Sequence, residues 1–175
     1  MRPLLTLLRF GRLLSLVLWI GGLCFFAFVV APVAFGRLAS AHEAGLVVGG
    51  TLRVLHVIGL CCGAVFVAVT AVAYRGAGSR RGVAAEVALA GAMMLLTAYS
   101  QFHILPAMES ARAGAGGDVE AVAATDTSRV EFERLHRVSE RVEGGVLLCG
   151  LALLLVVASE AAAGEGLPFR AAGSR

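Results

Sequence analysis

Four histidines are the residues of this chain best suited to hold a metal ion or a haem group. They are His42, His56, His103 and His136. Three acidic residues, Glu109, Glu140 and Glu143, are expected at the same end of the molecule. Neutral imidazoles with a carboxylate suit zinc, copper or iron, and two axial imidazoles suit haem. The spacing matches no compact metal-binding motif, so the alternative is that each histidine only hydrogen-bonds locally. The metal hypothesis assigns His56, His103 and His136 as ligands.

A second group of polar residues follows the last histidine at helical spacing. Ser139, Glu140 and Glu143 share one helix face with that histidine, just before an apolar run begins. A carboxylate that enters a membrane usually needs a partner or a water-filled cavity. The functional interpretation of Glu143 is proton relay or cation binding. The structural one is an ion pair with Arg53 or Arg141, or a position among the lipid headgroups.

A polar stripe runs along another apolar segment. Its members are Glu86, Met93, Thr97, Ser100 and Gln101. At 3.6 residues per turn these residues lie on one side of a helix, which is expected to face the interior of a bundle. The stripe either lines a polar path or joins helices through hydrogen bonds. For Glu86 we expect an ion pair at the surface with one of the nearby arginines, which are Arg75, Arg80 and Arg81.

Soft sulfur ligands offer a third possibility. Cys61, Cys62, Met93 and Met94 are two adjacent pairs within apolar segments. Such residues can bind copper(I), but they are also ordinary apolar filling, and adjacent residues point to different faces of a helix. All the cysteines lie in apolar segments, so a disulfide framework is not expected.

Four apolar segments must position these residues. They are Leu13–Phe35, Val54–Tyr74, Val83–Ala107 and Val142–Ala158. A helix needs about 20 mostly apolar residues to cross a bilayer, because its backbone polar groups must be satisfied internally. The chain has 175 residues, of which 58% are hydrophobic, and a mean hydropathy of +0.84. The fold class predicted is therefore an all-α membrane protein, a bundle of four transmembrane helices, with lipid as its surroundings.

Arginines indicate how this bundle is oriented. They cluster in the N-terminal segment 1–12, in the connection 75–82 and in the C-terminal tail, whereas the long connection 109–141 is richer in acids. Because cytoplasmic loops carry an excess of basic residues, both termini are expected in the cytoplasm of a cell with a bacterial-type inner membrane. The first apolar run is longer than that of a signal peptide, so the first helix is expected to remain uncleaved.

Helix-start signals extend two of the helices beyond the lipid. Ser40 with Glu43, and Ser128 with Glu131, have the spacing of capping boxes. The second and fourth helices are therefore expected to continue past the bilayer on the non-cytoplasmic side and to pack on each other there. The expected helices are 13–35, 41–74, 83–107 and 128–160, in one domain of residues 1–160, with a disordered cytoplasmic tail at 161–175.

Smaller signals concern packing and helix ends. Gly59 and Gly63 have the spacing that lets two membrane helices approach closely. Pro32 and Pro106 are expected to bend or end their helices. On the helix extension that precedes the last apolar run, Glu133 is expected to pair with Arg137, four residues later.

The sequence offers no sign of an enzyme. It contains no arrangement of serine, histidine and aspartate suited to hydrolysis, and no phosphate-binding glycine loop in its required context. It also lacks a basic stripe interleaved with aromatic residues, so nucleic-acid binding is not expected. No catalytic residue is assigned, and no cofactor is predicted beyond the metal ion or haem named above.

Two segments resemble the transmembrane-protein-205-like family. The first is Trp19–Phe35, with Gly21, Gly22, Pro32 and Phe35 at the family's structural positions, and the second is the pattern F-x-x-L-H-x-x-S at Phe132–Ser139. The family commonly has asparagine where this chain has Glu143. The resemblance implies a four-helix integral membrane protein with a long outer connection and, for most members, no assigned activity. A looser likeness, through Leu55–Gly59, is to four-helix membrane units of copper-resistance and haem-linked proteins.

The function predicted is the binding or permeation of a metal ion or small solute at the outer end of the bundle. The alternative is a non-catalytic scaffold that binds a membrane partner or a second copy of itself through small-residue helix faces. A haem-binding membrane protein is a more distant alternative.

Overall fold

The structure, a computed structural model, describes residues 2–73 and 80–164, and every regular element among them is helical. The elements are α1 (Arg2–Phe25), η1 (Phe26–Val30), α2 (Ala31–Arg37), α3 (Ala41–Ala73), α4 (Arg80–Tyr99), η2 (Ser100–Ile104), α5 (Leu105–Gly114) and α6 (Thr127–Gly164). The short elements η1 and η2 are π-helical turns that join their neighbours without a break. The described part of the chain therefore forms four long rods: α1–η1–α2, α3, α4–η2–α5 and α6.

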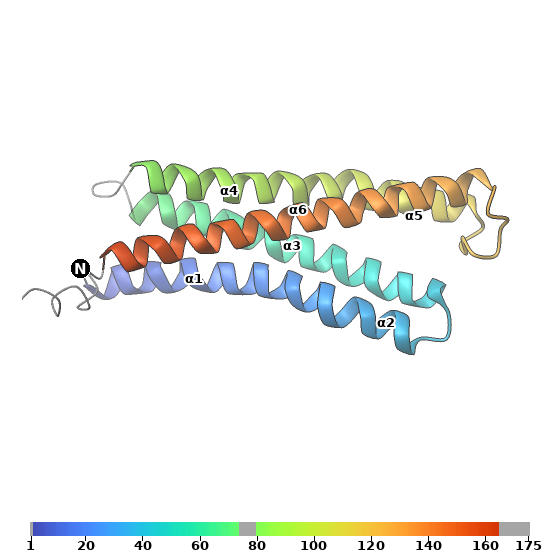
Figure 1. Cartoon of the computed structure of the whole chain (residues 1–175), viewed down its shortest axis with the longest axis horizontal. Helices are drawn as coiled ribbons and strands as arrows, with labels where there is room; N and C mark the ends of the chain where they lie inside the picture. The colour runs from blue at the N-terminus through green and yellow to red at the C-terminus, as the bar shows by residue number, and fades with distance from the viewer. Residues whose placement is uncertain (1, 74–79, 165–175) are drawn as a thin grey trace, which may run out of the picture.

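The rods lie side by side at one end of the molecule and separate at the other (Figure 1). The start of α1 and the end of α6 lie at the same end, here called the terminal end. Here α1 packs along α3, α4 packs along α6, and contacts of α3 with α4 and of α1 with α6 complete the bundle. At the opposite end, here called the loop end, α2 stays with α3 and α5 stays with α6, and the two pairs diverge.

Each rod is long and apolar enough to cross a membrane. The four candidate spans are Thr6–Arg37, Ala41–Val72, Gly82–Gly114 and Thr127–Ser159. Large apolar side chains point outward from the bundle, among them Phe28, Leu95, Leu148 and Leu155, each at least 70% exposed. In water such a surface would be costly, whereas lipid tails solvate it. The chain is a multi-pass membrane protein with the predicted four-helix architecture. The predicted tail lies at 161–175, of which 165–175 are outside the described residues.

The interior is packed most densely towards the terminal end. Leu16, Trp19, Phe66, Met93 and Leu153 are buried together there, from α1, α3, α4 and α6. The Trp19 indole lies directly over Gly59 and Gly63 of α3: a Cβ added at Gly63 would be 2.6 Å from Trp19 Cζ3. The small-residue spacing of α3 therefore serves packing inside the chain and leaves no gap there for a partner helix.

Pro32 and Pro106 do not end their helices, although ending them was one of the two alternatives expected from sequence. Each lies in the first turn of a helix, α2 or α5, that follows directly on a π-helical turn. In these turns the backbone hydrogen bond spans five residues instead of four. Ala31 N–H donates to Phe26 O, and Leu105 N–H donates to Ser100 O. The rods continue because the widened turn accommodates a proline that cannot donate.

The helix starts confirm one predicted cap and correct the other. Glu43 N–H donates to Ser40 Oγ at 3.1 Å, so Ser40 caps α3 as expected. The cap of α6 is Asp126, because its Oδ1 accepts the backbone N–H of Ser128 at 2.8 Å. The carboxylate precedes the predicted cap by two residues and reaches the first free amides of the helix.

The predicted contact between the extensions of the second and fourth helices is also wrong. The N-terminal part of α6 packs on α5, while that of α3 packs on α2. The prolonged third rod, which continues to Gly114, supplies α6 with a nearer partner than α3. The outer parts of α3 and α6 are therefore free to form opposite walls of a cavity.

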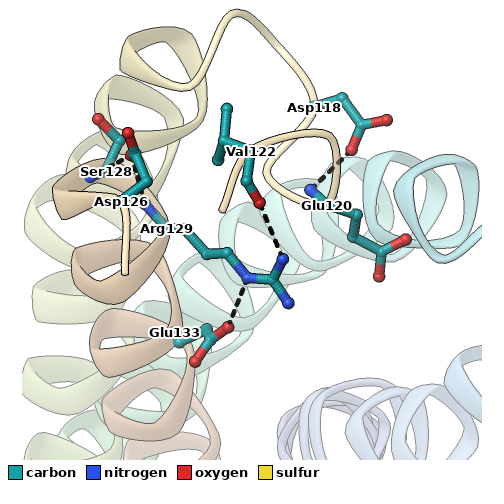
Figure 2. Close-up of polar contacts among 7 residues, drawn as sticks. All are labelled: Asp118, Glu120, Val122, Asp126, Ser128, Arg129 and Glu133. Carbon is teal, nitrogen blue, oxygen red and sulfur yellow. Dashed lines mark hydrogen bonds and ion pairs between the residues drawn. The ribbon is translucent and has the colours of Figure 1, made fainter. Parts of the chain in front are cut away.

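The connection 115–126 crosses the loop end and is fixed to α6 by one arginine (Figure 2). Arg129 Nη1 donates to the carbonyl oxygen of Val122 and Nε to Glu133 Oε1, both at 3.1 Å. This ion pair replaces the predicted one between Glu133 and Arg137, because Arg129 also satisfies a loop carbonyl from its position. Gly116 and Gly117, with φ of 76° and 99°, make the turn that leads out of α5.

Candidate functional site

A cavity of about 850 Å³ lies between the diverging helices at the loop end. Its walls come from the end of α1, η1 and α2 on one side, α3 on the second, and α5 with α6 on the third. Pro32 and Phe35, which mark the family resemblance, belong to the first wall, together with Phe26. Val119 and Glu120 of the connection also line it. The volume is in the range of small-molecule sites, and the lining is mostly apolar.

Polar groups gather on two of the walls. Ser139, Glu140 and Glu143 line the cavity from α6, as does His136. Across from them, Arg53 lines it from α3. Arg53 and Glu143 each precede a long run without charged residues, 54–73 and 144–159. The cavity thus lies where charged residues give way to long uncharged stretches of α3 and α6.

His56 connects three helical rods behind the cavity. It is 2% exposed, although imidazole is polar. Its Nδ1 lies 3.1 Å from Gln101 Oε1 on η2, and its Nε2 lies 2.9 Å from Glu143 Oε1 on α6. Both ring nitrogens thus have a partner, which a buried polar side chain requires. The three residues are called the His56 network below.

Glu143 lies at the boundary between this network and the cavity. Its side chain is 14% exposed and lines the cavity, while Oε1 contacts His56. Its Oε2 is buried and has no hydrogen-bond partner among the residues that the structure describes. The expected alternatives of an ion pair with Arg53 or Arg141 are therefore wrong. His56 takes this place because α3 and α6 face each other across the bundle at that level.

Gln101 is the member of the network that sequence analysis did not single out as a site residue. It was noted only as part of the polar stripe. That stripe faces the interior as predicted, with Glu86, Met93, Thr97 and Ser100 all at most 1% exposed. A signal that could have found Gln101 is Pro106 five residues later, since a proline inside a long helix often accompanies a π-helical turn at a functional position.

Glu86 does not form the surface ion pair that was expected. It is fully buried, and its Oε1 is paired with Nη2 of Arg12 on α1. The Arg12 guanidinium also lies over the Phe66 ring, 5.4 Å from the centroid. Arg12 can reach into the bundle because its long apolar stem packs among the helices, whereas Arg75 lies outside the described residues.

The predicted metal ligands do not come together. His103 is exposed beside the Tyr99 ring, and His136 is 46% exposed, with Nε2 3.4 Å from Glu140 Oε1. Of the four histidines, only His56 is buried. Within residues 2–73 and 80–164 no three side chains of the types histidine, cysteine, aspartate and glutamate form a group that could hold a metal ion. His42, the remaining histidine, lies 3.8 Å from Asp118 of the connection.

The sulfur residues lie at different depths in the bundle. Cys61 is exposed on the surface of the bundle, whereas Cys62 and Met93 are buried in the core. The two cysteines thus diverge around their helix, as predicted, whereas Met94 packs against the same core that contains Met93. Cys24, Cys61, Cys62 and Cys149 all have free thiols.

Comparison with known proteins gives one family. A family model described as "Domain of unknown function (DUF4149)" matches residues 14–116, which run from α1 to the turn after α5. His56 and Gln101 lie within the matched segment, whereas Glu143 on α6 lies beyond it. No curated protein and no solved structure matches the chain. The name of the transmembrane-protein-205-like family does not appear in the match, so that resemblance stays a prediction.

Proposed function

The chain belongs to the DUF4149 family, and we propose that it is a non-catalytic membrane protein that binds a small amphiphilic molecule in the loop-end cavity. The observation that carries this proposal is the cavity of about 850 Å³ with Glu143 at its boundary. Apolar walls suit a hydrocarbon chain, and the charged groups on α3 and α6 suit a headgroup. The proposal keeps the small-solute part of the function predicted from sequence and leaves out the metal ion.

The closed terminal end favours binding over free permeation. Between the His56 network and the terminal end, large apolar side chains such as Leu16, Phe66 and Met93, each at most 1% exposed, pack beside the buried polar stripe of α4. A water-filled pore would need a continuous polar lining there. The cavity is therefore a site open towards one end of the bundle.

Filling the cavity tests the proposal. Gly49 lines the cavity, and a Cβ added there meets no atom within 4 Å. We expect Gly49→Leu to fold normally and to lose ligand binding, because the new side chain occupies space that the ligand needs. The measurement is the Tm of purified protein in lipid nanodiscs with single-chain amphiphiles of cationic, zwitterionic, anionic and sugar headgroups. A ligand at about 100 times its Kd adds about 2.7 kcal/mol to the stability of the folded state.

The matched control is Gly91→Leu. Gly91 is also helical, has open space around its Cβ, and does not line the cavity. The proposal expects at least one amphiphile to raise the Tm of the wild type and of Gly91→Leu, but not that of Gly49→Leu. If no headgroup class raises the Tm, or if Gly49→Leu is stabilised as much as the control, the proposed function is wrong.

For the orientation we propose that the terminal end faces the cytoplasm of an inner membrane. The arginines near the N-terminus support this, since positive residues are retained on the cytoplasmic side. A single cysteine at Glu120, which lines the cavity from the connection, should react with a membrane-impermeant maleimide added to intact cells. A cysteine at Arg9, in a variant without the native cysteines, should react only after lysis. The opposite labelling pattern would reverse the orientation.

A further inference from the structure

We propose that His56 and Glu143 form a proton-binding site, and that an organic cation in the loop-end cavity exchanges with its proton. The proton-binding site is inferred from the His56 network alone. The cation exchange rests on the proposed function, because it names the headgroup class that the cavity takes.

The hydrogen bonds of His56 fix where its protons are. Gln101 Oε1 can only accept, so Nδ1, at 3.1 Å, carries a hydrogen and donates it. Nε2 lies 2.9 Å from Glu143 Oε1, and neither atom can bond to the other unless one of them carries a hydrogen. The pair therefore holds one further proton, either as imidazolium with carboxylate or as neutral imidazole with carboxylic acid. In both forms the pair has no net charge.

In the competing arrangement the side-chain amide of Gln101 is flipped, so that its oxygen and nitrogen exchange places. Its NH2 group would then donate to Nδ1, Nε2–H would donate to Glu143, and the pair would carry one negative charge. Burial opposes this form, because an ionised carboxylate away from water needs hydrogen-bond donors. Glu143 Oε2 is buried and has none among the described residues. The orphaned oxygen thus favours the arrangement that keeps the proton.

Most of the other charged groups that line the cavity already have an ionic partner. Those lining the cavity are His42 and Arg53 on α3, Glu109 and Arg112 on α5, Glu120 in the connection, and His136 and Glu140 on α6; α1, η1 and α2 contribute only apolar residues. Arg112 is 3.1 Å from Glu109, and His136 is 3.4 Å from Glu140. Arg53 is the cation nearest in sequence to His56, and it is exposed. Glu143 is therefore the carboxylate that joins the buried His56 network to the cavity.

A cation in the cavity can replace the proton without changing the charge of the site. When an ammonium headgroup settles beside Glu143, its charge balances the carboxylate, and the proton of the pair leaves to water. One cation enters and one proton is released. This exchange names the ligand class as an organic cation with an apolar chain, which the mostly apolar walls accommodate.

The protonation of the pair is measurable without any ligand. We expect NMR of protein labelled with ¹⁵N-histidine and ¹³C-glutamate to show, near pH 7, either an imidazolium at His56 or a carboxylic acid at Glu143. The Glu143→Gln variant assigns the signal, and it is nearly isosteric, so folding is expected. If that variant does not fold, His56→Gln provides the same assignment. A neutral imidazole beside an ionised Glu143 would overturn the proton-binding site.

Cation exchange is tested with decyltrimethylammonium, whose charge does not depend on pH. In weakly buffered solution, wild-type protein should release about one proton for each probe bound. Over the pH range in which the pair is protonated, the Kd should fall about tenfold for each unit of pH increase. Glu143→Gln should make binding independent of pH. The control is Glu131→Gln, whose side chain is 45% exposed and lies outside the cavity, and it should behave as wild type.

The possible failures are distinct. If sugar or anionic amphiphiles bind in a manner that Gly49→Leu abolishes, but no proton is released, the cavity function stands and the exchange is wrong. If no amphiphile binds at all, the proposed function fails, and NMR still decides whether the pair holds its proton. Binding of the probe that is unchanged across pH and in Glu143→Gln would also overturn the exchange.

Discussion

Replacing Glu86 by alanine should destabilise the protein by about 3–5 kcal/mol, the largest effect expected of a single substitution here. Glu86 is fully buried and paired with Arg12, which is 8% exposed. Removing the carboxylate leaves a charged guanidinium buried in a bundle surrounded by lipid, which is costly. The measurement is the free energy of unfolding, or the Tm, of purified protein in mixed micelles.

The double variant Arg12→Met with Glu86→Leu separates loss of the pair from loss of packing. Apolar residues of similar volume remove both charges together, so this variant should recover most of the stability lost in Glu86→Ala. The surface control is Glu131→Ala, since Glu131 pairs with Arg134 at 2.6 Å but both side chains are at least 45% exposed. Its Tm should change little. A double variant as unstable as Glu86→Ala would show that the ion pair is not what holds this region.

The second large effect is expected from a single methyl group at Gly59. An added Cβ would lie 2.7 Å from Trp19 Cδ1 and nearer still to Nε1. Trp19 is 3% exposed within the core, and a rigid indole cannot fold aside as a flexible side chain can. Overpacking of this kind typically costs about 1–3 kcal/mol, which exceeds the gain of up to about 1 kcal/mol from better helix propensity. We therefore expect a clear fall in Tm.

The rescue uses the same contact between α1 and α3, and the control uses a glycine of α4 that lies outside it. Gly91→Ala, where the added Cβ has open space, should leave the Tm unchanged or slightly raised. Combining Gly59→Ala with Trp19→Leu should cost less than the sum of the two single variants, because the smaller side chain makes room for the methyl group. If the two changes simply add, α1 and α3 do not touch through this contact.

The two buried pairs divide the bundle into regions with different roles. The pair of Arg12 and Glu86 joins α1 to α4 towards the terminal end, where the helices are packed together. The His56 network joins α3, η2 and α6 where the rods begin to diverge. The apolar core lies between them. Removing Glu86 is thus a test of stability, whereas removing Glu143 is a test of binding.

Glu86 shows why the partner of a buried charge cannot be assigned from the sequence. Arg80 is six residues away in the chain, whereas Arg12 is separated from Glu86 by 74 residues. Proximity in the chain favours Arg80 as the ion-pair partner of Glu86. Nothing in the sequence indicates which turn of α1 lies opposite which turn of α4. The relative position of two helices along their axes is set by packing, here by side chains such as Phe66 and Met93.

The histidines illustrate the same limit. Topology placed them towards one end of the bundle, but it could not show which of them face inward. Three of the four remain outside the core, and only His56 points to the interior. Its partner Gln101 lies in a π-helical turn, which shifts the residues beyond it around the helix axis relative to a regular α-helix. That shift depends on backbone hydrogen bonds that residue spacing does not reveal.

The sequence by itself determined that this is a four-helix membrane protein, because long runs of apolar residues can satisfy their backbone in lipid only as helices. It also determined that the stripe from Glu86 to Ser100 faces inward, since the 3.6-residue period fixes which residues share a face. The tertiary structure alone decided the partners of Glu86 and Glu143, the continuation of the rods past Pro32 and Pro106, and the cavity at the loop end. These features arise from how whole helices are placed against one another, and that placement is the sum of many weak contacts between residues far apart in the chain.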